Sequence, residues 1–401
     1  MNVAICIGTF NSRSDLVNEV LSKSIETYRK WGIDVYYMDS SEDDSVKNVV
    51  EKYIAEGYSN LRYEKKEDKD KAVSYYTGKI FDKEYDYVWA VKDRVFFDEK
   101  TIERVYGAME EGHDAIILGF LPQYTRRPCE TKVYDKPEEL YLDWGFMTTS
   151  LDATVFNRRT MLSGVTEEQI RSTTVSFTHF EVLFHMLVKE QRSVKALVGN
   201  DIVARNIKGV GSSYKAEMFE IWQDEWIEAN EKLPAYYEKY KAQVIKQTTS
   251  LPWLFGSVGA LLEYRRLNAL NAKNVDKIAK NWNKVSNIPV DTLIKIANDT
   301  YDITHDLSII PSSINELVNL LIEMANRLRK GQMQKEQIPY ESILKGIMNY
   351  VIKKYNGNGY IANCINGTVH DVLYYLHDTA TSQEEIQKSI QTLISILILS
   401  L

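Results

Sequence analysis

The sequence predicts an α/β domain followed by a helical domain. Short apolar segments alternate with amphipathic helical patterns over roughly the first 120 residues, which is typical of a parallel sheet with helices on both faces. Beyond residue 260 the pattern is almost wholly helical, with proline and glycine breaks between segments. A chain of 401 residues is long enough for two domains. We therefore expect an α/β domain over residues 1–250 and a helical bundle over residues 260–401.

The first part of the chain provides the alternating pattern. Apolar segments that end at glycine or at polar residues predict strands, and apolar residues at helical spacing predict the helices between them. The expected strands are residues 3–8, 34–38, 60–63, 87–91 and 115–118, and the expected helices are residues 15–31, 46–56, 71–80 and 101–111. Ligands of such sheets bind beyond the carboxyl ends of the strands. The loops after Ile7, Met38 and Val91 are therefore the candidate binding loops.

The rest of the chain is more helical. Residues 180–189 and 218–231 are expected helices, and residues 252–259 are the expected junction between the domains. The helices expected in the bundle are residues 261–285, 290–300, 314–329, 340–355, 362–377 and 383–399. Their apolar stripes are first of all core positions. Three uses of the bundle stay open: binding an acceptor, forming a homo-oligomer, or holding a partner transferase.

Composition restricts the class of protein. Because the net charge is -7, we do not expect the protein to bind nucleic acid through its phosphates. The three cysteines, Cys6, Cys129 and Cys364, are far apart and odd in number, so no disulfide framework is expected and a reducing cytoplasm fits. The first residues have a strand pattern rather than that of a signal peptide. We expect a cytoplasmic protein, and the apolar residues 393–401 leave a peripheral position at the inner membrane face open.

Three segments at expected strand ends carry motifs in a fixed order. Residues 3–11 read Val-Ala-Ile-Cys-Ile-Gly-Thr-Phe-Asn, residues 37–44 read Tyr-Met-Asp-Ser-Ser-Glu-Asp-Asp, and residues 86–95 read Asp-Tyr-Val-Trp-Ala-Val-Lys-Asp-Arg-Val. Together they resemble the opening strand and loop, the second-strand acid and the Asp-X-Asp segment of family 2 type glycosyltransferases with the GT-A fold. The resemblance covers roughly residues 1–240. It implies a Rossmann-like domain that binds a nucleotide-diphospho-sugar, with UDP as the expected nucleotide.

The same resemblance implies the residues that would hold the donor. Thr9, Phe10, Asn11 and Arg13 would contact the nucleoside, and backbone N–H groups at such a strand-to-helix turn can point at ligand oxygens. Asp39 would accept hydrogen bonds from the ribose or the base. Its alternative role is that of a turn or cap acid, because the residues after it are good turn formers.

The Asp-X-Asp segment departs from the family pattern. Its flanking acids are replaced by Lys92 and Arg94, so that only Asp93 remains. In one hypothesis Asp93 alone binds a Mn²⁺ or Mg²⁺ ion at the leaving diphosphate. In another, Lys92 and Arg94 stabilise the diphosphate without a metal. A catalytically dead site and an ordinary surface turn are further alternatives.

An inverting transferase also needs a general base near the acceptor hydroxyl. The family carries this carboxylate at the start of a helix, and Glu181 is the best match for it, with His179 as a second candidate. Asp152 is a third candidate and an expected acceptor contact. Trp144 could stack on a sugar ring, although an aromatic beside a glycine is more often part of a core. The alternative for Glu181 is a first-turn acid that the helix dipole favours.

The resemblance implies a hexosyl- or N-acetylhexosaminyltransferase, and the inverting outcome is expected from the resemblance alone. By the resemblance alone, the acceptor is a bacterial surface or cell-wall glycan, a teichoic-type polymer or a glycoprotein. The incomplete Asp-X-Asp favours a rival hypothesis, a non-catalytic nucleotide- or sugar-binding scaffold of a glycosylation complex. A nucleotidyltransferase that makes the activated sugar is disfavoured, because the N-terminal region has no glycine-rich loop with a lysine.

Overall fold

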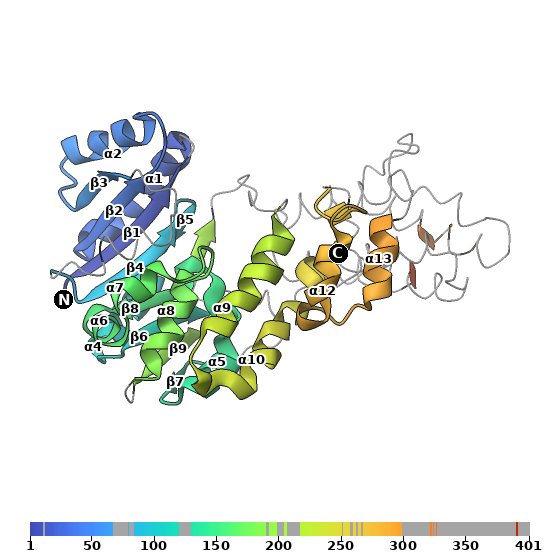
Figure 1. Cartoon of the computed structure of the whole chain (residues 1–401). Helices are drawn as coiled ribbons and strands as arrows, with labels where there is room; N and C mark the ends of the chain where they lie inside the picture. The colour runs from blue at the N-terminus through green and yellow to red at the C-terminus, as the bar shows by residue number, and fades with distance from the viewer. Residues whose placement is uncertain are drawn as a thin grey trace. The chain divides into compact units, whose positions relative to one another are not determined.

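The computed structural model forms two compact units (Figure 1). The structure describes residues 1–10, 13–66, 79, 84–119, 130–189, 192–198, 204–206, 217–250, 252–256, 260–261, 264–265, 268–298, 321–322, 324, 326 and 390–391. The first unit comprises Met1–Leu121, Arg127–Gly211 and Asp224–Ile245, and the second comprises Pro122–Arg126, Ser212–Gln223 and Lys246–Leu401. The expected domains at residues 1–250 and 260–401 stay a prediction, because most of the second range lies outside the described residues.

An eight-stranded sheet in the order β3-β2-β1-β4-β8-β6-β9-β7 forms the centre of the first unit. Its strands are β1 (Val3–Thr9), β2 (Ile33–Asp39), β3 (Leu61–Lys65), β4 (Tyr87–Lys92), β6 (Ala115–Gly119), β7 (Lys132–Tyr134), β8 (Thr154–Asn157) and β9 (Val194–Val198). The half β3-β2-β1-β4 is parallel, as expected, and has the order of a Rossmann half. The prediction of a parallel sheet was incomplete, because β8 pairs antiparallel with both β4 and β6. The predicted α/β fold class is confirmed.

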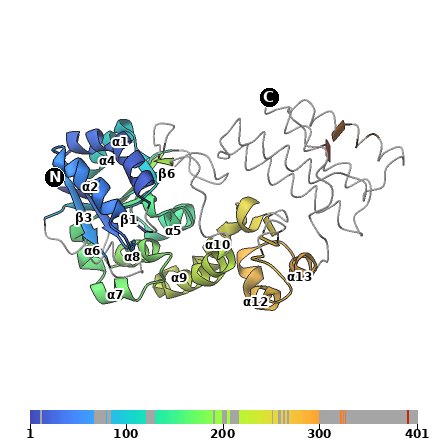
Figure 2. The ribbon, with the colours of Figure 1, turned by 90° about the horizontal axis from the view of Figure 1, so that it is seen from above.

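Helices cover both faces of this sheet, and Figure 2 shows α1 and α4 on one side and α6 and α8 on the other. The helices are α1 (Ser14–Lys30), α2 (Ser45–Ala55), α4 (Glu99–Glu110), α5 (Pro137–Trp144), α6 (Arg158–Gly164), α7 (Glu167–Arg171), α8 (Thr178–Leu187), α9 (Trp226–Lys232) and α10 (Glu238–Ile245). The apolar stripes of α1, α2 and α4 share one buried core with alternate residues of β1, β2 and β4. The stripe of α1 ends at Tyr28, so the helix is fixed along its whole length.

A second, aromatic core lies among α5, α8, α9 and α10. The ring centroids of Tyr141 and Tyr237 are 4.8 Å apart, and those of Phe180 and Trp226 are also 4.8 Å apart. Two of these rings donate to backbone carbonyls: Tyr237 donates to Phe184 O at 3.0 Å and the Trp226 indole to Ile245 O at 3.1 Å. This core holds α8 in place, and α8 carries two of the predicted site residues.

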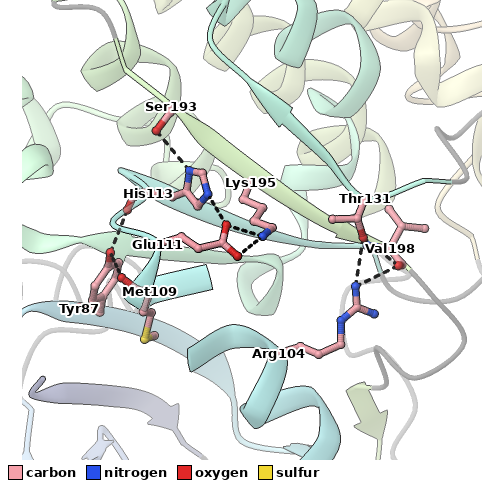
Figure 3. A network of polar contacts seen from close by, with 9 residues as sticks. All are labelled: Tyr87, Arg104, Met109, Glu111, His113, Thr131, Ser193, Lys195 and Val198. Carbon is pink, nitrogen blue, oxygen red and sulfur yellow. Dashed lines mark hydrogen bonds and ion pairs between the residues drawn. The ribbon is translucent and has the colours of Figure 1, made fainter. Parts of the chain in front are cut away.

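The amino ends of β6 and β9 carry a polar network (Figure 3). His113 Nδ1 lies 3.2 Å from Ser193 Oγ, and His113 Nε2 lies 2.9 Å from Glu111 Oε2. Lys195 Nζ also contacts Glu111 at 2.5 Å, and Tyr87 donates to the His113 carbonyl at 2.9 Å. These contacts tie two strands and the end of α4 together at the edge opposite to the candidate binding loops.

In the second unit the described residues include α12 (Val275–Val285) and α13 (Val290–Asn298). Trp282 packs on Phe255 with centroids 5.2 Å apart. The predicted helix over residues 261–285 was wrong in extent, because residues 268–274 form turns and Asn268 has a φ of 59°. The predicted helix 71–80 and most of those beyond residue 300 lie outside the described residues. No helix in the described part of the chain is both long and apolar enough to cross a bilayer.

Candidate functional site

Four parallel strands bring their carboxyl ends to one edge of the sheet. In the strand register Thr9 of β1 lies beside Asp39 of β2, and Asp39 lies beside Lys65 of β3. On the other side of β1, Gly8 lies beside Lys92 of β4. The three motifs, far apart in the sequence, therefore meet at this edge, where ligands of α/β sheets bind.

Asp39 is buried and has partners on both oxygens. Its Oδ1 accepts the Ser41 N–H at 2.9 Å, and its Oδ2 accepts the Tyr63 hydroxyl at 3.0 Å and lies 3.9 Å from Lys65 Nζ. The contact with Ser41 is an Asx turn, so the turn role left open by the sequence is present. Beside it, the Thr9 hydroxyl is buried and has no hydrogen-bond partner within the described residues. A contact of Asp39 with a nucleoside stays a prediction.

Asp93 and Arg13 form an ion pair across the edge. Asp93 lies in the tight turn between β4 and β5 (Val95–Phe97), and Arg13 immediately precedes α1. Arg13 Nη1 donates to Asp93 Oδ2 at 2.9 Å. The same guanidinium lies over the Phe10 ring, 4.0 Å from its centroid, in a cation–π arrangement. The structure thus brings together three predicted residues, Phe10, Arg13 and Asp93. Asn11, which was predicted in the same loop as Phe10 and Arg13, lies outside the described residues.

Lys92 and Asp152 form a second ion pair beside the first. Asp152 Oδ1 accepts the backbone N–H of Lys92 at 2.7 Å, and its Oδ2 accepts Lys92 Nζ at 2.9 Å. Ser150 Oγ accepts the same ammonium at 3.1 Å. The carbonyl of Asp152 also accepts the Trp89 indole N–H at 2.9 Å. These four bonds fix the segment before β8 to the end of β4, which places Asp152 at the same edge as Asp93 and Arg94.

His179 is buried near this second pair. Its Nε2 donates to Thr149 O at 2.8 Å, so the neutral ring has its proton on Nε2. Burial is the main cause that lowers the pKa of His179 to about 4; the bond to Thr149 opposes it, and Lys92 and Asp152 have smaller effects that lower and raise the pKa, respectively. A ring with this pKa is neutral and only weakly basic at neutral pH. Its Nδ1 is buried without a partner among the described residues.

Glu181 lies in the first turn of α8 and is only 1% exposed. Its Oε1 accepts the Thr174 N–H at 2.7 Å and the Thr174 hydroxyl at 2.5 Å. Burial raises the pKa of Glu181 to about 7, although both bonds from Thr174 lower it. The pKa is suitable for a general base at neutral pH, while the burial gives it a structural role as well. The assignment of the base to Glu181 stays a prediction.

Trp144 is fully buried in this structure. Its indole N–H donates to the Tyr134 hydroxyl at 2.9 Å. A Cβ placed on Gly119, at the end of β6, would lie 2.8 Å from the Trp144 ring. Trp144 therefore has the core position that was the alternative to sugar stacking. No face of its ring reaches solvent in this structure.

The described side chains at this edge do not fit a resident divalent cation. Mg²⁺ and Mn²⁺ prefer several oxygen ligands, carboxylates above all. Each carboxylate here already has a cation: Asp39 has Lys65, Asp93 has Arg13, and Asp152 has Lys92. Within the described ranges no three His, Cys, Asp or Glu side chains are grouped to hold a metal. Asp93 as a metal ligand stays a prediction, which its pairing with Arg13 opposes.

Lys65 and Ser150 are among the residues of the edge that sequence reasoning missed. Lys65 ends β3, whereas the expected strand ended at residue 63. Extending that strand by two residues in parallel register would have placed Lys65 beside Asp39. Ser150 had no comparable signal, because it reaches Lys92 only through the antiparallel insertion of β8.

Comparisons with known proteins add little to this geometry. No family model matches the chain, and no curated protein matches it in sequence. Among solved structures it is similar to S. aureus TarS 1–349 in complex with UDP-GlcNAc, with a TM-score of 0.45, 14% identity, and coverage of 74% of this chain and 90% of that chain.

Two further solved structures are similar to the chain at TM-scores below 0.5. One is the mannosyltransferase PcManGT from Pyrobaculum calidifontis in complex with GDP-Man and Mn²⁺ (TM-score 0.44, 13% identity, 73% of this chain and 78% of that chain). The other is 4-diphosphocytidyl-2C-methyl-D-erythritol synthase from Anaerococcus prevotii (TM-score 0.33, 17% identity, 51% of this chain and 89% of that chain). Similarities this low assign no ligand or reaction to this chain.

Proposed function

We propose that the chain is a glycosyltransferase that takes a hexosyl or N-acetylhexosaminyl group from a nucleotide-diphospho-sugar, with UDP as the expected nucleotide. One observation carries the proposal. The three segments that resemble family 2 type glycosyltransferases converge on the carboxyl ends of β1, β2 and β4, which are neighbours in the sheet. Two cations, Arg13 and Lys92, are held there by buried carboxylates.

The donor would lie along this edge with its charge at the cations. Thr9 and Asp39, at the ends of β1 and β2, would face the nucleoside. The diphosphate would lie toward β4, between Arg13 and Lys92 and near Arg94, because phosphate oxygens pair strongly with guanidinium and ammonium groups. Cations aimed at the leaving diphosphate stabilise the charge that develops when the sugar leaves.

The reaction would be a direct displacement. The acceptor hydroxyl oxygen forms a bond to the anomeric carbon as the bond from that carbon to the diphosphate oxygen breaks. The electron pair leaves with the nucleoside diphosphate, the hydroxyl proton passes to the base, and the configuration inverts. The pKa of about 7 supports Glu181 as the base. Asp152 competes for this role, because it lies at the edge itself.

The acceptor and the location follow only from the resemblance. We infer a bacterial surface glycan, a teichoic-type polymer or a glycoprotein as the acceptor, and a cytoplasmic site of action. Acceptor binding, self-association or a partner transferase are the proposed uses of the C-terminal helices. A second candidate function, a non-catalytic nucleotide-binding scaffold, is favoured by the pairing of all three edge carboxylates and by the burial of Glu181.

The test is nucleotide release from a panel of UDP-, GDP- and CDP-sugars by the full chain. For the enzyme we expect slow release of one nucleotide. The release rate should fall at least tenfold in Lys92→Gln, because a tenfold loss is about the contribution of one charged hydrogen bond. Arg171→Gln removes an exposed ion pair with Glu167 instead and serves as the control. Binding of a nucleotide sugar without any release, with or without candidate acceptors, would favour the scaffold. Neither binding nor release would overturn both.

A further inference from the structure

We propose that Arg13 takes the place of a divalent metal ion at the donor diphosphate, so that donor binding needs neither Mn²⁺ nor Mg²⁺. This inference rests on the proposed function, because it concerns the same nucleotide-diphosphate site. The observation behind it is that Asp93, the remaining carboxylate of the Asp-X-Asp segment, already has a cation bound to it from the first loop.

The position of Arg13 is built by two independent contacts. Its Nη1 lies 2.9 Å from Asp93 Oδ2, and the Asp93 side chain is 6% exposed while that of Arg13 is 23% exposed. In the second contact the guanidinium lies over the Phe10 ring, with its Cζ atom 4.0 Å from the ring centroid. β1 and β4 are adjacent and in register up to Gly8 and Lys92, so the two loops start from neighbouring, fixed strand ends. The guanidinium is therefore held in advance of ligand binding.

A metal ion at Asp93 would have to displace this arginine. A second cation at the same buried carboxylate would be repelled by the guanidinium, because the repulsion is screened less there than in water. Among the described residues at this edge, a second carboxylate for a metal site could come from Asp39 or Asp152. Those are paired with Lys65 and Lys92, respectively. Among the described residues the edge thus satisfies its own negative charges with side-chain cations.

Arg13 has the chemistry that the site needs. A guanidinium stays charged at all accessible pH values and carries five N–H donors in a planar fork. One donor is used by Asp93, and the fork geometry suits two oxygens of a phosphate group. Lys92, the residue before Asp93, is fixed by Asp152 and Ser150 and supplies a second cation at the end of β4. No bond to Arg13 forms or breaks in the reaction, since it acts by charge and by hydrogen bonds.

Calorimetric titration of the full chain with UDP, GDP and CDP, in EDTA and in MnCl₂, tests this inference. The wild type should bind one nucleotide with the same Kd in both buffers. Arg13→Gln should weaken binding about 10- to 100-fold in EDTA, the value of one or two charged hydrogen bonds. It should recover part of that loss in MnCl₂, because Asp93 is then open to a metal. Arg13→Lys keeps the charge but loses the planar fork. Its nucleotide affinity in EDTA should lie between those of the wild type and Arg13→Gln, and MnCl₂ should raise it little.

The control is Arg29→Gln on the same helix, whose guanidinium forms an exposed pair with Glu26. It should bind like the wild type in both buffers. A direct readout is the electron paramagnetic resonance of free Mn²⁺ with protein but without nucleotide. The wild type should leave the signal unchanged, Arg13→Gln should reduce it, and adding Asp93→Ala to Arg13→Gln should restore it.

Two results would overturn the inference in different ways. Wild-type binding only in MnCl₂, or equal binding by wild type and Arg13→Gln in EDTA, would overturn the role of Arg13 and leave the glycosyltransferase proposal intact. A folded wild type that binds no nucleotide in either buffer would overturn the proposed function and this inference together.

Discussion

Asp152 binds Lys92 through both of its carboxylate oxygens, one to the backbone N–H at 2.7 Å and one to the side-chain ammonium at 2.9 Å. One residue therefore fixes both the end of β4 and the direction of its terminal cation. The carboxylate is buried, whereas the ammonium is partly exposed, so the charge of Lys92 is presented at the edge of the sheet. Asp152 is thus a positioning residue for a cation of the proposed donor site.

Asp152→Asn should weaken both the fold and the site. The variant loses a charged hydrogen bond that is partly buried, and we expect the free energy of unfolding to fall by about 1–3 kcal/mol. We expect nucleotide affinity to fall as well, because Lys92 is no longer held. Urea unfolding and calorimetry measure the two effects. Glu167→Gln, which removes an exposed ion pair with Arg171, should change stability by less than about 1 kcal/mol.

Glu181→Gln should remove a pH dependence of stability. The pKa of Glu181 in the folded state is about 7 instead of the usual 4.5, so the folded state binds this proton more tightly than the unfolded state. The stability from this group is complete below about pH 4.5 and is lost as pH rises through about 7, by about 3 kcal/mol in total.

Wild type and Glu181→Gln should therefore be about equally stable near pH 4, and the variant should be the more stable at pH 8. The difference between the two unfolding free energies at each pH isolates Glu181 from all other titrating groups. An unchanged difference across this range would contradict the raised pKa. If Glu181 is the base, the variant should also lose about 100-fold or more in kcat while remaining folded.

His179 should stay neutral through the physiological range. Its pKa of about 4 means that the unfolded state binds the proton more tightly. Its contribution to stability is present above about pH 6.5 and is lost as pH falls through about 4. Nitrogen-15 correlation spectra of the imidazoles should show one ring protonated at Nε2 that does not titrate between pH 5 and 8, and that is absent in His179→Gln. A midpoint near 6.5 for that ring would refute the effect of burial.

Gly119→Ala should destabilise the first unit. The new Cβ would lie 2.8 Å from the Trp144 ring and 3.1 Å from Leu197 O, and overpacking of this kind costs about 1–3 kcal/mol. Thermal and urea unfolding measure the loss, and Trp144→Phe in the same chain should recover part of it. Gly107→Ala in α4 is the matched control. A Cβ there meets nothing within 4 Å, so the change should be neutral or stabilising by up to about 1 kcal/mol.

The sequence predicted the elements whose pattern is local. Strands β1, β2 and β4 and helices α1, α2 and α4 lie within about two residues of their expected ranges, because their apolar periodicity reports directly on burial. The position of β8 was beyond reach, since pairing with β4 and β6 depends on contacts distant in sequence. The expected helix 261–285 was too long because its apolar pattern continues across the turn at Asn268.

The location of the site could be predicted from the sequence, whereas the ion-pair partners of its residues could not. Motifs at the ends of β1, β2 and β4 had to meet, because parallel strands bring their carboxyl ends to one edge. The partners of Asp93 and Lys92 were not predictable, since Arg13 and Asp152 reach them from other loops. The family resemblance directed attention to a metal at Asp93, whereas the structure has an arginine there.

We propose that this edge of the sheet binds a nucleoside diphosphate through side-chain cations. The most direct test is a calorimetric titration of the full chain with UDP in EDTA. We expect saturable binding at one site that is weakened about 10- to 100-fold in Arg13→Gln and unchanged in Arg29→Gln. A folded wild-type chain that gives no binding with UDP, GDP or CDP, with or without Mn²⁺, would contradict it.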